Sequence, residues 1–123
     1  MSVERASEHP VHDLGGTTIT SLAAPARGAH EVALFRTEVP AGGGLPRHHH
    51  DHLDVFVIER GSATFSVGAE TFELSAGDSF VVPIGEWHEL KAGEEGATLV
   101  VTMLGGTKMF REDGSVGVPP WVG

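Results

Sequence analysis

The chain has 123 residues, no cysteine, and 17 acidic side chains against 8 Lys and Arg, which gives a formal net charge of −9. Its length suits one domain, and 40% hydrophobic with 20% charged residues is the composition of a globular protein. The negative charge argues against nucleic acid and membrane surfaces as partners, and the lack of cysteine excludes disulfides, thiolate nucleophiles, cysteine zinc fingers and iron–sulfur clusters.

Residues 1–16 are interpreted as an N-terminal arm. They contain no apolar run of the length that a signal peptide needs, and no part of the sequence approaches the ~18 apolar residues of a membrane span. We therefore expect a soluble, cytoplasmic protein.

From residue 31 onward the sequence alternates between apolar and polar residues with a period of two, and no segment sustains the 3.6-residue period of a helix. The segments that this pattern predicts as short strands are 31–39, 53–59, 64–67, 71–74, 79–82, 88–92 and 97–104. Glycine and proline predict turns between several of them, at 68–69 (a type II′ hairpin), 75–78, 83–86 and 93–96. Strands at such spacing predict an antiparallel, all-β sandwich or barrel with little helix.

Aromatic side chains are distributed along these predicted strands and beyond them. Those expected in the core are Phe35, Phe56, Phe65, Phe72 and Phe80. The segment after the strands, residues 105–123, is predicted to be a C-terminal tail that ends in Pro119, Pro120 and Trp121. We expect it to wrap the outside of the fold or to pack on a partner through Trp121, with a frayed tail as the alternative.

Four of the eight histidines lie within five residues, namely His48, His49, His50 and His52. A fifth, His88, lies 36 residues beyond His52. In a strand, residues i and i+2 point to the same face, so His48 and His50 project together and Asp54 shares their parity. His49 projects to the opposite side, where we expect a solvated surface. His88 enters from another strand and can complete the set. Two or three imidazoles with one carboxylate, and positions left open, suit Fe(II), Mn(II), Ni(II) or Zn(II).

Two stretches resemble the sequence motifs of the cupin family. The first, G(X)5HXH(X)3–4E(X)6G, is similar to residues Gly42–Gly61, and the second, G(X)5PXG(X)2H(X)3N, to Gly77–Ala92. All fixed positions agree at the correct spacing except two, where Asp54 replaces Glu and Ala92 replaces Asn. The asparagine is a turn and packing position, so its replacement is the smaller departure.

The resemblance implies that residues 1–123 form a single cupin domain, an antiparallel double-stranded β-helix or jelly-roll barrel. It implies one divalent metal, Fe, Mn, Ni or Zn, with His48, His50, Asp54 and His88 as its ligands. Asp54 is one methylene shorter than the usual Glu, so it either ligates directly, reaches the metal through water, or leaves a three-histidine site. His52 has the parity of His48 and is the substitute ligand.

The resemblance allows dioxygenases, isomerases, polyketide cyclases, lyases and non-catalytic binders, among which the fold does not choose. The parity of Glu59 and Glu89 predicts that both face outward, which leaves few acid–base groups inside and favours chemistry done by the metal itself. Our first hypothesis is a metal-dependent, oxygenase-type enzyme acting on a small organic substrate. The alternatives are an isomerase or polyketide cyclase-like enzyme and a non-catalytic small-molecule binding module. We expect a homodimer, with the N-terminal strand edge and Trp121 supplying its surface.

Overall fold

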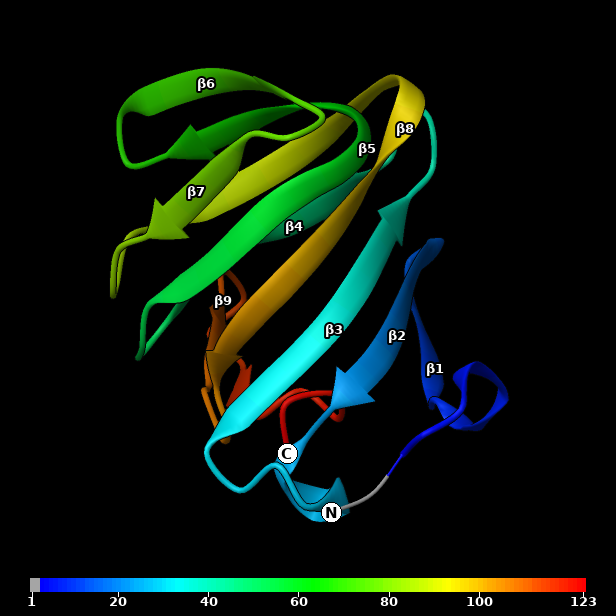
Figure 1. Cartoon of the computed structure of the whole chain (residues 1–123). Helices are drawn as coiled ribbons and strands as arrows, with labels where there is room; N and C mark the ends of the chain where they lie inside the picture. Colours follow the sequence, from blue (N-terminus) through cyan, green and yellow to red (C-terminus); the bar gives the residue numbers. More distant parts are fainter. Residues whose placement is uncertain (1–2) are drawn as a thin grey trace.

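Strands make up most of residues 3–123, the part of the chain that this computed structural model describes (Figure 1). In chain order they are β1 (Val11–Leu14), β2 (Thr17–Ala23), β3 (Val32–Val39), β4 (Gly44–His50), β5 (Asp54–Val67), β6 (Glu70–Ser75), β7 (Ser79–Val82), β8 (His88–Leu104), β9 (Met109–Arg111) and β10 (Val116–Gly117). The helical elements of the described residues are two 3-10 turns, η1 (Ala6–Glu8) and η2 (Pro25–Arg27). Within the same residues, no helix has the length and apolar character needed to cross a membrane.

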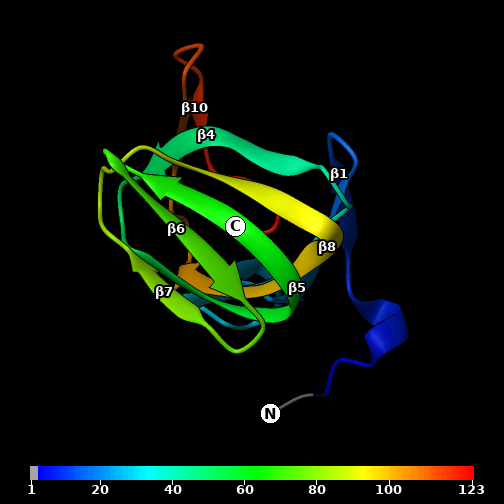
Figure 2. The same ribbon diagram turned by 90° about the horizontal axis from the view of Figure 1, so that it is seen from above.

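The strands pair antiparallel around two long central strands, β5 and β8. These two pair along their whole length, while β8 also pairs with β3 and β4, and β5 also pairs with β6 and β7. The sheet therefore curls back on itself, as the view from above shows (Figure 2). The predicted all-β, antiparallel jelly-roll barrel with little helix is confirmed.

The predicted turn at residues 93–96 is wrong, because β8 runs through it without interruption. Its glycines mark a bend instead. Gly61 of β5 and Gly96 of β8 have φ angles of +80° and +79°, and the β5–β8 register shifts on both sides of Gly61. A Cβ atom on Gly61 would overlap the carbonyl oxygen of Gly96, so the two backbones touch where the paired strands bend from one side of the barrel to the other.

The predicted turns at 68–69, 75–78 and 83–86 are present. Gly68 has φ +57° and Ala69 a negative φ, which is the sign pattern of the expected type II′ hairpin between β5 and β6. The predicted strand segments lacked β1, β2, β9, β10 and also β4, of which only the end at His48–His50 was treated as a strand. In β2 the buried positions include Thr17 and Ser21, whose polar side chains hide the alternation.

The core lies between the inner faces of the strands. Its buried aromatic side chains are Phe35, Phe56, Phe65 and Trp121, while Phe72 and Phe80 are half-buried at its edge. Residues 112–118 of the C-terminal tail are exposed, as expected of a segment that wraps the outside, but the end of the tail enters the core. Trp121 is only 6% exposed and meets Phe35 edge-on with ring centroids 6.4 Å apart, and Val122 is fully buried. Burial of a large apolar side chain stabilises the fold, so Trp121 helps to close this barrel.

Candidate metal centre

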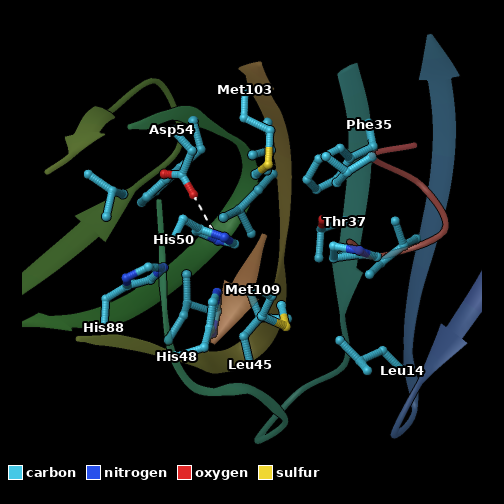
Figure 3. Close-up of a pocket in the computed structure, with 18 of the residues that line it drawn as sticks. Leu14, Phe35, Thr37, Leu45, His48, His50, Asp54, His88, Met103 and Met109 are labelled. Carbon is cyan, nitrogen blue, oxygen red and sulfur yellow. Dashed lines mark ion pairs between the residues drawn. The ribbon is translucent and has the colours of Figure 1, made fainter. Parts of the chain in front are cut away.

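His48 and His50 both point inward from the end of β4, as their shared parity predicts. In β4 the burial alternates, and both side chains are about 5% exposed. His88, the first residue of β8, lies directly opposite His48 in the β4–β8 ladder. The ring centroids are 4.3 Å apart for His48 and His88 and 4.8 Å for His48 and His50. One nitrogen from each of the three rings lies within 4.8 Å of the others, a group that can hold a metal ion (Figure 3).

Each of the three rings is oriented by a backbone carbonyl. The Nδ1 atom of His48 lies 2.6 Å from the carbonyl oxygen of Pro46, and that of His88 lies 2.9 Å from the carbonyl oxygen of Glu86. The Nδ1 atom of His50 lies 3.0 Å from the carbonyl oxygen of Lys108. Because a carbonyl only accepts hydrogen bonds, each Nδ1 carries the proton and each Nε2 keeps its lone pair. Carbonyl partners of this kind are the usual outer support of metal-binding histidines.

Burial keeps these imidazoles uncharged. It lowers the pKa of His48 to about 3, with the neighbouring His88 as the next cause, and it lowers the pKa of His88 to about 4. Burial also lowers the pKa of His50. At neutral pH all three rings are therefore neutral, which is the form that binds a metal.

Asp54, the first residue of β5, lies beside this three-histidine group, which does not include it, and contacts His50. Its side chain is 7% exposed, its Oδ2 lies 3.5 Å from Nε2 of His50 (Figure 3), and its Oδ1 is buried without a hydrogen-bond partner among the described residues. Burial raises its pKa to about 7. The carboxylate oxygens of Asp54 and the imidazole lone pairs that they face are all hydrogen-bond acceptors. These buried atoms therefore have neither a hydrogen-bond donor nor a positive charge beside them. A divalent cation would satisfy these atoms, so the donor set fits the metals expected from the sequence.

His52 lies outside this group. Its side chain is 43% exposed, and its Nδ1 is 3.1 Å from Oδ1 of Asp51. The strand ends at His50 and the chain bends at residues 51–52, so strand parity no longer sets the direction of His52. The outward placement expected for Glu59 and Glu89 is confirmed, since both are exposed.

His49 projects away from the metal group but is half-buried, not fully solvated as expected. Its ring stacks on Phe110 with centroids 4.7 Å apart and an interplanar angle of 5°, and it meets Trp87 edge-on at 4.5 Å. Its Nδ1 is buried without a hydrogen-bond partner in the part of the chain described. Both partners come from segments distant in sequence, β9 and the turn before β8, so no local pattern predicts this packing.

The histidines open onto a cavity inside the barrel. This cavity has a volume of about 60 Å³. Sequence reasoning missed three of its wall residues, Thr37, Pro119 and Trp121. Two of them belong to the C-terminal tail, whose position depends on tertiary packing and has no signature in the local sequence.

A protein-family model described as a cupin domain matches residues 35–105. Among solved structures, an RmlC-like cupin from Shewanella frigidimarina is 24% identical with a TM-score of 0.72, and the alignment covers 82% of this chain and 87% of that one. The polyketide cyclase RemF from Streptomyces resistomycificus is 21% identical with a TM-score of 0.75, covering 85% and 79%. Oxalate decarboxylase from Bacillus subtilis is 19% identical with a TM-score of 0.71, covering 78% of this chain and 27% of that one. No curated protein matches the chain.

Proposed function

Because this chain belongs to the cupin family, and because three neutral imidazoles converge on an enclosed cavity, we propose that it is a metal-dependent enzyme acting on a small organic substrate. In this proposal residues 1–123 are a single cupin domain. His48, His50 and His88 hold one divalent transition metal, and Asp54 is the fourth ligand. The observation that carries the proposal is that Nδ1 of each ring lies beside a backbone carbonyl, an arrangement that leaves each Nε2 lone pair free for a metal.

The first candidate reaction is an oxygenation. When bound, such a metal polarises substrate oxygens and, as iron, activates dioxygen. The chain's own contribution is to position the ion and to exclude water, because the cavity wall outside the four proposed ligands is almost entirely apolar. Glu89 borders the cavity but is exposed, so few groups remain inside to carry protons. This scarcity favours chemistry at the metal over proton transfer between side chains.

A second candidate, an isomerase or polyketide cyclase-like reaction, is favoured by Asp54. A carboxyl with a pKa of about 7 exchanges its proton readily at physiological pH, and this one lies beside His50 on the cavity wall. If Asp54 is not a ligand, its Oδ atoms can give a proton to a substrate atom and take one back. The polyketide cyclase RemF shares the fold but not enough sequence to carry its activity over.

The metal site is tested by elemental analysis of the protein purified without a histidine tag. We expect about one metal per chain in the wild type and less than about a tenth of that in His48→Ala and His88→Ala. His52→Ala is the matched control, because it removes a neighbouring but exposed imidazole. Equal metal content in the wild type, His48→Ala and His88→Ala would overturn the proposal.

The reaction class is tested on the metal-loaded protein with a panel of diketones and catechols. Oxygen uptake after Fe(II) is restored supports the oxygenase. Deuterium incorporation from D₂O without oxygen uptake, abolished in Asp54→Asn, supports the isomerase or cyclase. Saturable binding with neither reaction identifies a non-catalytic binding module.

A homodimer remains a prediction, which now depends on the N-terminal strand edge without Trp121. Trp121 is buried within one chain, whereas β1 pairs only with β2 in the described residues and so offers one free strand edge. Analytical ultracentrifugation of the wild type decides the oligomeric state. A β1 variant such as Asp13→Pro, which removes a backbone donor from the free edge of this strand, is expected to weaken a dimer formed through it.

A further inference from the structure

The cavity wall carries no group of positive charge. Within residues 3–123 its lining includes no Lys, Arg, Asn or Gln side chain. Apart from the four proposed ligands and Glu89, the lining is aliphatic, aromatic or thioether, with two exceptions that contain a neutral hydrogen-bonding group, Thr37 and Trp121. The wall therefore offers a substrate apolar contact and two neutral polar contacts.

Thr37 and Trp121 lie together on the β3 side of the cavity. Thr37 and Phe35 are seen there across from His88, and Trp121 packs edge-on against Phe35 (Figure 3). Buried threonines elsewhere donate to backbone carbonyls, Thr17 to Gly44 and Thr107 to Leu104. Thr37 is itself only 2% exposed to solvent and lines the cavity.

The cavity meets the surface at an apolar mouth. Leu14, Leu45 and Pro46 line both the cavity and a shallow outer depression that continues onto Gly15 and Gly44. A ligand that enters here passes aliphatic side chains and leaves its hydration shell behind. A carboxylate or ammonium group would lose that shell with no opposite charge on the wall to replace it.

We propose that the substrate is an uncharged, largely hydrocarbon molecule with metal-ligating oxygen atoms at one end and a hydrogen-bond acceptor at the other. The metal-ligating oxygen atoms face the histidines, an assignment that rests on the proposed function. The acceptor binds the hydroxyl of Thr37 and the indole N–H of Trp121. Thr37 is then a specificity-determining residue. Sites of this kind reject molecules whose polar groups they cannot pair.

Three short-chain hydroxamates of equal length test this inference. All three share the same metal-binding head. Their tails end in a methyl group, a methyl ketone or a carboxylate. They are titrated into the zinc-loaded and the metal-free protein while the indole N–H resonances are followed by NMR. The chain has two tryptophans, so Trp87→Phe assigns the signal of Trp121. We expect the neutral tails to shift that signal and the carboxylate tail to bind at least about tenfold more weakly.

Thr37→Val supplies the matched control, because it removes the hydroxyl at nearly constant volume, and Thr37→Ser restores it. We expect Thr37→Val to weaken the ketone about three- to tenfold, with little effect on the methyl tail and rescue by Thr37→Ser. Equal binding of carboxylate and neutral tails, no response of Trp121 to any tail, or an equal loss for all three in Thr37→Val would overturn the inference. The zinc content of the wild type and of His48→Ala is measured separately and tests only the proposed metal site. If that site fails the test, the preference of the metal-free protein among the three tails still decides the inference about the substrate.

Discussion

Oδ2 of Asp54 lies 3.5 Å from Nε2 of His50, and the two side chains are 7% and 5% exposed. Since Nδ1 of His50 donates to the carbonyl of Lys108, its Nε2 carries no proton in the neutral ring. Two acceptors therefore face each other inside the barrel. In the metal-free protein a proton on Asp54 resolves this contact, and a bound cation can do so in the metal-loaded protein.

This contact predicts an unusual pH dependence for the metal-free protein. The pKa of Asp54 is raised from its usual 3.8 to about 7, so the folded state holds a proton that the unfolded state releases. The stability contribution of Asp54 is therefore present below about pH 4 and is lost as the pH rises through about 7, by on the order of 4 kcal/mol. Asp54→Asn has no such titration. We expect its advantage over the wild type in urea unfolding to grow between pH 4.5 and 8.

Binding of a metal should reverse the order of stability of the wild type and Asp54→Asn. With zinc bound, Asp54→Asn is expected to be less stable than the wild type at pH 8, because a charged ligand is replaced by a neutral amide. A difference between the two proteins that is independent of pH in the metal-free form would contradict the assigned environment of Asp54.

The buried histidines predict that the stability of the metal-free protein rises with pH, which is opposite to the effect of Asp54. The folded-state pKa values of His48 and His88, about 3 and about 4, lie below the usual 6.5. Their contribution to stability is fully present above pH 6.5 and is lost as the pH falls toward these values, by on the order of 3 kcal/mol for each ring at pH 4. We expect metal-free Asp54→Asn to lose stability steeply between pH 6.5 and 4. Adding His48→Gln should flatten that slope, whereas adding His52→Gln should leave it unchanged.

Chelation should lower the unfolding temperature. A metal that binds only the folded state stabilises it by about 4 kcal/mol when present at a thousand times its dissociation constant, which for a domain of this size is roughly 10 °C or more. Thermal unfolding with zinc and with EDTA measures the difference. His88→Ala should show almost none, and a shift of wild-type size in that variant would indicate that the ion binds elsewhere.

Alanine substitutions at Gly61 and Gly77 together test the bend in the barrel, with Gly77→Ala as the matched control. Both have positive φ, +80° and +95°, but a Cβ on Gly61 would overlap the carbonyl of Gly96, whereas one on Gly77 meets nothing within 4 Å. Gly77→Ala should cost about 1–2 kcal/mol from backbone strain alone. Gly61→Ala should cost at least about 2 kcal/mol more, because the paired backbones must separate. Similar unfolding free energies for the two variants would argue against the close contact of β5 and β8.

The sequence predicted what depends on local period and spacing. Alternation placed His48, His50 and Asp54 on one inward face, and the motif spacing brought in His88 from a distant strand. The glycines of these motifs were also informative, whereas Gly93 and Gly96, which lie outside the motifs, were interpreted as a turn. A glycine with positive φ suits a turn and a strand bulge equally, and only the pairing of β8 with β5 distinguishes the two.

The rest could not be predicted because it depends on which segments meet. Thr37 has no special motif and gains its importance from the position of β3 across the cavity from His88. Trp121 becomes part of the wall because the tail returns to Phe35. His49 obeys strand parity, yet Phe110 and Trp87 cover it from distant segments. Such contacts are tertiary, and composition or period gives no access to them.

The ladder that sets His48 opposite His88 joins strands 40 positions apart in the chain, and the β5–β8 ladder begins with Asp54 opposite Met103. Loops of this length close slowly, so folding is expected to be slow compared with helical proteins of equal size. The ion cannot recruit its complete set of ligands from an early, locally ordered segment. Tight metal uptake during refolding should therefore be a late kinetic phase, arriving together with the last recovered tertiary signal.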